Sequence, residues 1–285
     1  MKYECFSVLM SVYYKEKAEY LKRSLKSILE DQVVKPNEVV IVKDGPLGDP
    51  LEKIIKLYKS EYPDIIKVIA LKENVGLGEA LKIGLKHCSN EIVARMDSDD
   101  ISLPSRFEKQ LKIINKKEVD VVGNWVLGFE NDENNIKYLK KFPENHKDIC
   151  SFAKKRSPTP HASSMFKKSS VLEVGGYIHF LNFEDYYLWV RLLMKDKIFY
   201  NIQEPLFKMR MDDEMFTRRG GWNYYIREVK LHYTFYQIGF INFYEFIRNA
   251  SIRTIVRLVP NKLRKWIYSN FLRDKADEFV LNNKL

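Results

Sequence analysis

Residues 91–100 have the sequence EIVARMDSDD, an apolar segment of strand length that ends directly in three carboxylates. Similar apolar segments precede it, and segments with apolar residues at helical spacing lie between them. The sequence predicts strands at 6–13, 38–42, 66–71 and 91–96, and helices at 16–31, 51–58 and 78–87. Strands that alternate with helices at this spacing are typical of a parallel sheet built from right-handed crossover units, so we expect an α/β fold.

The chain beyond residue 100 has a weaker pattern. It predicts helices at 106–114 and 184–194, strands at 119–126, 164–166 and 198–202, and a loop-rich segment at 130–150. From Trp222 onward the segments are long, helical, aromatic and basic, with breaks near Gly239 and Pro260. We therefore expect an α/β domain at 1–220 and a helical C-terminal appendage at 221–285.

Composition narrows the class of protein. The 285 residues are 45% hydrophobic and 30% charged, which is typical of a folded domain and excludes a disordered chain. The net charge of +10 indicates an acidic partner: nucleic acid, anionic lipid or a phosphorylated substrate. The three cysteines are far apart and form no C-x-x-C pair, which excludes a cysteine zinc site and indicates a reducing compartment.

Polar side chains stand where the four predicted strands end. In parallel sheets of this kind, ligands bind beyond the carboxyl ends of the strands, so we expect these side chains to meet at one edge. They are Ser11 and Tyr13 after the first strand, Asp44 after the second, Asn74 after the third, and Asp97, Asp99 and Asp100 after the fourth.

The three carboxylates that follow the fourth strand predict a metal site. Carboxylates packed within four residues repel one another, and Mg²⁺ or Mn²⁺ would relieve that repulsion while leaving positions open for phosphate oxygens. The alternative is a polar turn that caps the next helix, because the segment from Asp100 to Pro104 has the character of a helix start. Asp100 fits such a cap better than a metal ligand.

The ordered set SVLMSVYYKE, EVVIVKDGP, ENVGLGEALKIGL and IVARMDSDD resembles the family 2 glycosyltransferases over residues 5–215. The resemblance implies a GT-A fold, a Rossmann-like, mostly parallel sheet flanked by helices, and a UDP-sugar donor. It implies that Ser11, Tyr13 and Asp44 line the uridine pocket, and that Asp97 and Asp99 form the D-x-D motif, with Asp99 the direct metal ligand. We assign Asn74 and Arg95, at the same strand ends, to the donor side as well.

The sequence departs from the family pattern at two of these strand ends. Ser11-Val12 stands where Pro-Thr is common, and Lys43-Asp44 where Asp-Asp is common. Asp44 is therefore the one acidic candidate for the contact with the base. Its alternative role is an Asp-Gly turn.

Two adjacent carboxylates, Glu184 and Asp185, stand at the start of a predicted helix. Transfer of a sugar to a hydroxyl needs a carboxylate to take the proton. Neighbouring helical side chains point about 100° apart, so one of the two faces a cleft. The family pattern Glu-Asp-aromatic-Leu-Trp is matched here and implies that Asp185 is the base of an inverting displacement. Glu184 would then orient the acceptor or the loop. The alternative is acidic capping of the helix N-terminus.

Several other polar positions have less specific patterns. His161 is either a metal or phosphate contact or a hydrogen-bonded structural residue, and Gly175-Gly176 predicts only a backbone turn. Relatives often carry a metal-binding histidine two residues after the arginine that aligns with Arg210, but this chain has Asp212 there. Arg218 and Arg219, followed by two glycines, suit a mobile loop that closes on the donor diphosphate; the alternative is a solvated basic turn.

The C-terminal region alternates basic and aromatic residues, which is typical of an interfacial anchor on anionic lipid. The alternatives are a core-packing helical appendage or a homodimer interface. No window holds 18 uninterrupted apolar residues, and the chain opens on what has the character of a core strand. We therefore expect a cytoplasmic protein, peripheral on the inner face of the cell membrane.

These patterns together predict an inverting, metal-dependent hexosyltransferase. It would move galactose or glucose from a UDP-sugar to a sugar hydroxyl of a lipid-linked acceptor, in the assembly of a surface polysaccharide such as O-antigen or capsule. A nucleic-acid-binding protein would show a basic recognition helix or an aromatic sheet motif, and neither is present. A non-catalytic membrane-peripheral scaffold with this fold is the alternative, and the joint presence of Asp97, Asp99 and Asp185 argues against it.

Overall fold

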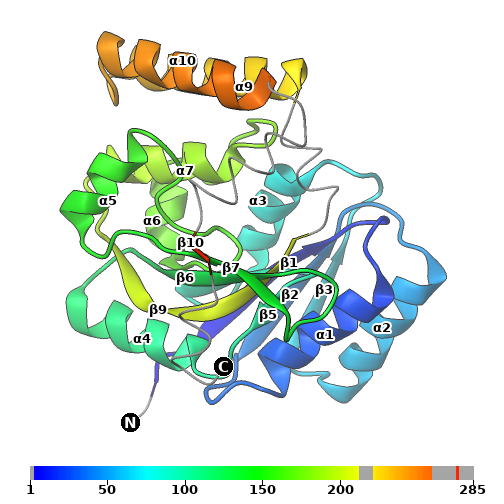
Figure 1. The fold of residues 1–285 in the computed structure, drawn as a ribbon. Helices are drawn as coiled ribbons and strands as arrows, with labels where there is room; N and C mark the ends of the chain where they lie inside the picture. The colour runs from blue at the N-terminus through cyan, green and yellow to red at the C-terminus, as the bar shows by residue number, and fades with distance from the viewer. Residues whose placement is uncertain (1–2, 212–220, 259–273, 276–285) are drawn as a thin grey trace.

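A computed structural model describes residues 3–211, 221–258 and 274–275 of the chain. Its centre is a ten-stranded mixed sheet, in which the longest path of paired strands runs β10-β7-β6-β8-β4-β1-β2-β3 (Figure 1). The strands are β1 (Phe6–Val12), β2 (Glu38–Lys43), β3 (Ile66–Ala70), β4 (Ile92–Asp97), β5 (Ile101–Ser102), β6 (Val121–Phe129), β7 (Ile136–Lys140), β8 (Met165–Lys167), β9 (Phe199–Arg210) and β10 (Asp274–Lys275).

The N-terminal half forms the parallel part of the sheet. Strand β1 lies between β2 and β4 and is parallel to both, and β3 extends the sheet beyond β2. The crossover helices are α1 (Ala18–Leu29), α2 (Asp49–Glu61) and α3 (Leu77–His87). The predicted α/β architecture is confirmed, with strand ends within two residues of the predicted ones. The strand order reverses between β1 and β4, which is where open α/β sheets bind ligands.

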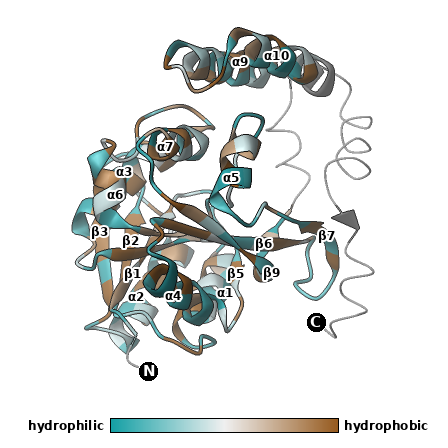
Figure 2. Cartoon of the chain, turned by 90° about the vertical axis from the view of Figure 1, so that its left-hand side faces the viewer, coloured by the Kyte–Doolittle hydropathy of each residue, from teal (hydrophilic) through white to brown (hydrophobic). Residues whose placement is uncertain are grey.

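Helices cover both faces of the sheet, and the alternation of β1 shows how. Val8 and Met10 belong to the core that packs against α1, α2 and α4 (Arg106–Lys117). Leu9 points the other way, into the core formed with α3, α5 (His146–Ala153), α6 (Lys168–Glu173) and α7 (Glu184–Leu193). Because side chains alternate along a strand, a strand that is buried on both faces is apolar throughout, and the central strands are hydrophobic along their length (Figure 2).

The second half of the sheet is mainly antiparallel and differs from the prediction. The segment 130–150 contains β7 and α5, although a loop was predicted. Strand β7 escapes detection because, of its five residues, only Leu139 is buried. Strand β9 is also far longer than predicted, because it pairs with β6 along almost its whole length and with β5 near its end.

The last described helices, α9 (Trp222–Gln237) and α10 (Phe243–Leu258), form a hairpin on the α7 side of the sheet (Figure 1). The predicted break at Gly239 is confirmed: Gly239 has φ 79° and follows Ile238, the C-cap of α9. The break predicted at Pro260 lies outside the described residues. A third core joins the hairpin to α7 through Tyr186, Val190, Leu231 and Phe235.

None of the helices in the described part of the chain is long and apolar enough to cross a bilayer.

Candidate active site

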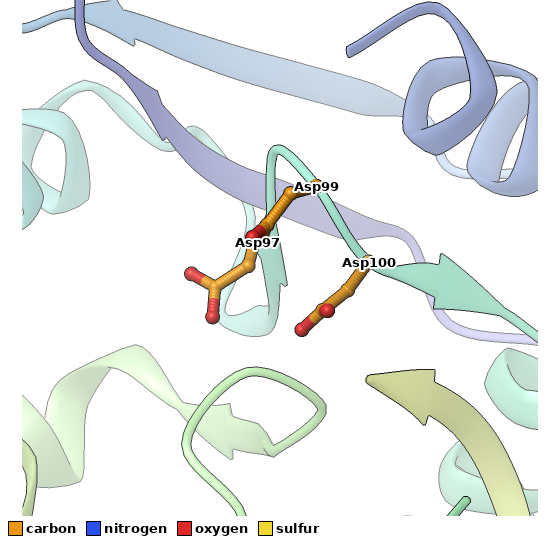
Figure 3. Close-up of side chains that lie close together, drawn as sticks. All are labelled: Asp97, Asp99 and Asp100. Atoms are coloured by element: carbon orange, nitrogen blue, oxygen red, sulfur yellow. The ribbon is translucent and has the colours of Figure 1, made fainter. Parts of the chain in front are cut away.

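The turn between β4 and β5 carries Asp97, Ser98, Asp99 and Asp100, and we call it the carboxylate turn (Figure 3). Its three aspartates each place a carboxylate oxygen within 4.8 Å of the others. Burial and the neighbouring charges of Asp97 and Glu16 raise the pKa of Asp99 to about 7. Burial, Asp99 and Asp97 raise the pKa of Asp100 well above its ordinary value. The fold thus concentrates negative charge at one point.

Backbone contacts fix the shape of the carboxylate turn. Asp100 is 2% exposed, and its carboxylate accepts a hydrogen bond from the backbone N–H of Arg210, at 2.8 Å. The hydroxyl of Ser24 donates to the carbonyl of Asp97, at 2.8 Å. The prediction that Asp100 caps a helix is wrong, because β5 follows it and α4 begins only at Arg106. Asp100 instead fastens the turn to β9.

Sequence reasoning missed two side chains that surround the turn. Glu16 accepts a hydrogen bond from the hydroxyl of Ser98, at 2.5 Å, and burial raises its pKa. Arg210 donates from Nε to the carbonyl of Asp99, at 3.2 Å, and its guanidinium lies 3.6 Å from the ring centre of Tyr20. Both residues lie in segments named in the sequence analysis. Their sequence context alone does not indicate a role, because only the fold brings Glu16 and Arg210 to the carboxylate turn.

Arg95 has a different position from the one expected of a donor-binding side chain. It is 0% exposed, donates to the carbonyls of Leu9 and Met96, and forms an ion pair with Asp97. Its Nε has no hydrogen-bond partner. A fully buried guanidinium cannot reach a ligand in solution, so Arg95 acts through Asp97, which it holds in place.

Ser11 and Tyr13 lie at the carboxyl end of β1. Ser11 is the register partner of Asp97 in the pairing of β1 with β4, so the two side chains leave the sheet side by side. Ser11 and Tyr13 are both partly exposed. The structure therefore brings Ser11 next to the carboxylate turn, and Tyr13 follows directly after β1.

Asp44 and Asn74 form a clasp between the ends of β2 and β3. The carboxylate of Asp44 accepts hydrogen bonds from the backbone N–H of Val75 (2.7 Å), the backbone N–H of Gly76 (3.2 Å) and the side-chain amide of Asn74 (3.1 Å). Gly45 follows with φ 87°, and a Cβ on it would lie 2.7 Å from the backbone nitrogen of Asn74. Asp44 thus orders the loop that leads into α3, as well as standing at the predicted pocket.

Glu184 and Asp185 occupy the first turn of α7. Burial and the charge of Asp185 raise the pKa of Glu184 to about 7. The side chain of Glu184 packs on the start of α3, where a Cβ on Gly78 would lie 3.3 Å from its Cβ. Tyr177 is buried, and the charges of Asp185, Asp97 and Glu184 all help to raise its pKa, so both carboxylate groups act on the same hydroxyl.

His161 is a half-buried, hydrogen-bonded structural residue in this fold. Its Nε2 is hydrogen-bonded to the hydroxyl of Tyr177, at 2.9 Å, and its ring lies edge-on to Trp189. Burial and the charge of Arg95 lower its pKa well below the ordinary range, so the imidazole is neutral. The structural alternative is therefore the better account. Gly175 and Gly176 have φ of 86° and 68°, which agrees with the predicted backbone turn.

Three further predicted positions, Asp212, Arg218 and Arg219, lie outside the described residues. They follow β9 in the chain, whose last residue, Arg210, touches the carboxylate turn.

The residues at this edge suit a hard divalent cation. Only carboxylates make up the cluster, and burial strengthens their mutual repulsion until Asp99 holds its proton near neutral pH. A divalent cation that takes oxygen ligands would remove this cost and displace the proton. A second pair of carboxylates, at the start of α7, includes one poised near neutrality, as a general base or its partner requires.

The sequence of the chain is similar to those of known proteins. The model of the family "Glycosyl transferase family 2" matches residues 7–175. The UDP-Gal:alpha-D-GlcNAc-diphosphoundecaprenol beta-1,3-galactosyltransferase of Escherichia coli is 38% identical over 269 residues, which are 94% of this chain and 96% of that protein. The amylovoran biosynthesis glycosyltransferase AmsE of Erwinia amylovora is 39% identical, over 92% of this chain and 97% of its own length.

Solved structures share the fold at low identity. TarS of S. aureus matches with a TM-score of 0.63 and 17% identity, over 93% of this chain and 48% of that one. The mannosyltransferase PcManGT of Pyrobaculum calidifontis, solved with GDP-Man and Mn²⁺, matches with a TM-score of 0.60 and 16% identity, over 92% of this chain and 72% of that one.

Proposed function

The chain belongs to glycosyl transferase family 2 and has the GT-A fold, and from this premise we propose that it transfers galactose from UDP-galactose to a sugar hydroxyl of a lipid-linked acceptor. One observation carries the proposal. The carboxylate turn, Ser11 at its side and the pair Glu184-Asp185 belong to one electrostatic neighbourhood at the carboxyl ends of the strands. A donor and an acceptor need such a pair of acidic groups, one for a metal and one for a proton.

In the donor half of the site, Asp97 and Asp99 would hold Mn²⁺ or Mg²⁺, which would supply positive charge to the departing diphosphate. Arg95 orients Asp97 by its ion pair, and Ser98 ties the turn to Glu16. Ser11, Tyr13 and the Asp44–Asn74 clasp bind the nucleoside. Arg218 and Arg219, which lie outside the described residues, are the further candidates for binding the diphosphate.

In the acceptor half, Asp185 takes the proton of the attacking hydroxyl. Burial and the charge of Asp185 raise the pKa of Glu184 to about 7, so Glu184 is partly protonated near neutral pH. The hydroxyl then attacks the anomeric carbon opposite the diphosphate. A single displacement of this kind inverts the configuration at that carbon.

The choice of galactose and of a diphosphate-linked lipid acceptor rests on the Escherichia coli relative, whose name gives both. AmsE and the O-antigen biosynthesis glycosyltransferase WbnJ of Escherichia coli, which is 34% identical, support the setting of surface-polysaccharide assembly. An acceptor of this kind stays in the membrane, so the protein would work on the cytoplasmic face of the cell membrane as a peripheral protein. The net charge of +10 suits both the diphosphate and an anionic membrane.

The activity is tested by UDP release from UDP-galactose, UDP-glucose and UDP-N-acetylglucosamine. Purified protein is supplied with a synthetic N-acetylglucosaminyl diphosphate lipid, and Mn²⁺ is compared with EDTA. We expect release with UDP-galactose in Mn²⁺ and its loss in EDTA. Equal UDP release in EDTA would contradict the metal requirement. UDP release with only one of the other UDP-sugars would contradict galactose as the sugar transferred.

Two variants separate the two halves of the site. Asp99→Asn is expected to abolish the increase in Tm that Mn²⁺ gives the wild type, together with activity. Asp185→Asn is expected to lower kcat by about 10²–10⁴-fold and to leave UDP binding unchanged, because it removes only the base. The exposed Asp64→Asn is the control. If both site variants turn over like the control, the two carboxylates do not have the proposed roles. If the wild type and the control also release no UDP with this acceptor, the protein is the non-catalytic scaffold.

A further inference from the structure

The α9–α10 hairpin exposes a row of large apolar side chains on its outer side. On α9 the buried residues Tyr224, Glu228, Leu231 and Phe235 recur at helical spacing. Trp222, Ile226 and Tyr233 recur on the opposite side of the same helix, since each residue turns by about 100°. We call the exposed set the outer stripe, and it consists of Trp222, Ile226, Tyr233, Tyr236, Phe243, Tyr244 and Ile247.

The outer stripe is continuous across the two helices. The ring of Tyr236 lies 5.9 Å from that of Phe243, where α9 ends and α10 begins. Phe246 on α10 contacts α9: its ring centre lies 5.8 Å from that of Tyr233 and 6.1 Å from that of Tyr236. Tyr244 is 75% exposed and Trp222 and Phe243 are each 60% exposed, so much of this aromatic surface faces solvent.

The acidic side chains of the hairpin lie on the side that faces the rest of the protein. Its two acidic residues, Glu228 and Glu245, are paired with Arg253 (3.3 Å) and with Lys154 of the main domain (3.0 Å). Both acids thus lie on the side that faces the protein. Lys230 on α9 is exposed, and Arg227 and Arg248 add further positive charge. The outer side is therefore apolar and aromatic, with the exposed Lys230 beside it. Arg227, which also donates to Asn182, and Arg248 lie nearer the protein side of the hairpin.

We infer that the outer stripe is a membrane-binding surface that lies flat in the headgroup region of an anionic bilayer. An amphipathic helix pair with aromatic residues on one side and basic residues around it has the chemistry of an interfacial anchor. Tyrosine and tryptophan suit this region because each has an apolar ring and a polar group. A second copy of the chain would instead have to bury the same positive charges against one another. The inference rests on the proposed function, because a lipid-linked acceptor brings the enzyme to a bilayer.

The hairpin is clamped to the catalytic helix α7, so the membrane would set the position of the base. The hydroxyl of Tyr186, the residue after Asp185, donates to the carbonyl of Ala153 at 2.5 Å, and its ring packs 4.9 Å from that of Phe235 on α9. The amide of Asn249 on α10 donates to the carbonyl of Lys154, at 2.7 Å. Membrane, hairpin and the start of α7 would then move as one body.

The loop that leads into α7 lies beside the same hairpin. Arg227 donates to the side-chain oxygen of Asn182, at 2.9 Å, and Tyr224 packs on Phe183, with ring centres 5.1 Å apart. Ile178 and Leu181 in this loop are exposed. An acceptor whose lipid lies in the bilayer would thus meet apolar side chains close to Glu184 and Asp185.

The surface is tested by flotation of the full chain with vesicles. Vesicles of phosphatidylcholine with about a third phosphatidylglycerol are compared with pure phosphatidylcholine. We expect the wild type to float with the anionic vesicles, and the double variant Tyr244→Ser, Ile247→Ser to bind at least about tenfold more weakly. Phe243→Ser serves as a second variant. The matched control is Val33→Ser, Leu57→Ser, which removes two exposed apolar residues elsewhere and is expected to bind like the wild type.

Activity with two acceptors separates this inference from the proposed function. The double variant is expected to keep wild-type turnover with a short-chain acceptor in solution and to lose it with a long-chain acceptor in vesicles. Wild-type flotation of the double variant would overturn the inference, as would a dimer in solution that the same substitutions dissociate. If the wild type turns over neither acceptor but still binds the vesicles, the result contradicts the proposed enzymatic activity and not the membrane-binding surface.

Discussion

Glu184 is a carboxyl group that the fold keeps close to neutrality. It is half-buried at the start of α7 beside a second acid, and both effects oppose its ionisation and raise its pKa to about 7. The helix dipole at the start of α7 favours the ionised form but does not outweigh burial and Asp185. Asp99 is in the same condition across the site, for the same two reasons. Residues that are costly to ionise and cluster at one edge are typical of a functional site.

The pH dependence of stability tests this account of Glu184. In the unfolded chain a glutamate ionises near pH 4.5, whereas in the folded protein it ionises near pH 7. The contribution of Glu184 to the free energy of unfolding is thus most favourable below pH 4.5. It falls as the pH rises to 7 and stays low above pH 7. Glu184→Gln is expected to raise the free energy of unfolding by about 1–3 kcal/mol at pH 8 and to change it little at pH 4.5. Urea unfolding at both pH values measures this, with the exposed Glu61→Gln as control; an equal effect at both would contradict it.

The loop between β3 and α3 is an element whose shape is set from a distance. Its backbone N–H groups at Val75 and Gly76 are held by the carboxylate of Asp44, which comes from the end of β2. The close passage of Gly45 past Asn74 makes room for this clasp. Two neighbouring strand ends are therefore joined at the place where the nucleoside is proposed to bind.

Gly45→Ala is expected to break this clasp. The residue has φ 87°, a region that costs an alanine about 1–2 kcal/mol, and its Cβ would lie 2.7 Å from the nitrogen of Asn74. We expect a loss of at least about 2 kcal/mol in stability and weaker UDP binding, measured by denaturant unfolding and by calorimetry. Gly48→Ala is the matched control, since its Cβ would meet only Pro50, at 3.7 Å. Normal UDP binding by Gly45→Ala would argue against a role of the loop in the donor pocket.

The described part of the molecule has one sheet and three cores, and the third core makes the C-terminal hairpin part of the whole. Phe235 on α9 is 0% exposed and packs against Tyr186 and Tyr187 of α7. His232 beside it is buried, and burial lowers its pKa to about 3, so it enters the interface uncharged. The division of the chain at residue 220 remains a prediction, but α9 and α7 share their apolar side chains.

Phe235→Ala tests whether the hairpin and the sheet unfold together. Loss of a buried aromatic ring is expected to destabilise the whole chain by about 3–5 kcal/mol and to speed hydrogen exchange in α7 as well as in α9. Tyr233→Ala, two residues away and 46% exposed, is the control. Faster exchange confined to α9 and α10 would show that the hairpin unfolds on its own.

Much of this arrangement follows from local patterns in the sequence. Strands β1, β2 and β4 are largely apolar because they are buried on both faces, and the acidic residues follow strand ends directly, so the edge that carries the site was predictable. The roles of Glu16, Arg210 and Asp100 were not, because each depends on a contact between elements more than 80 residues apart. Strand β7 was missed since its one buried residue leaves no alternation to detect.

Gly78 and Glu184 are in contact, so the start of α3, on the donor side of the proposed site, packs against the start of α7, on the acceptor side. Gly78 opens the helix that follows the nucleoside loop, and Glu184 opens the helix of the proposed base, with only the width of a hydrogen side chain between them. A side chain at position 78 would lie 3.3 Å from the Cβ of Glu184, so Glu184 would have to shift by a few tenths of an ångström. Across natural variants of this chain, positions 78 and 184 are therefore expected to change together, so that donor and acceptor preferences evolve as linked traits.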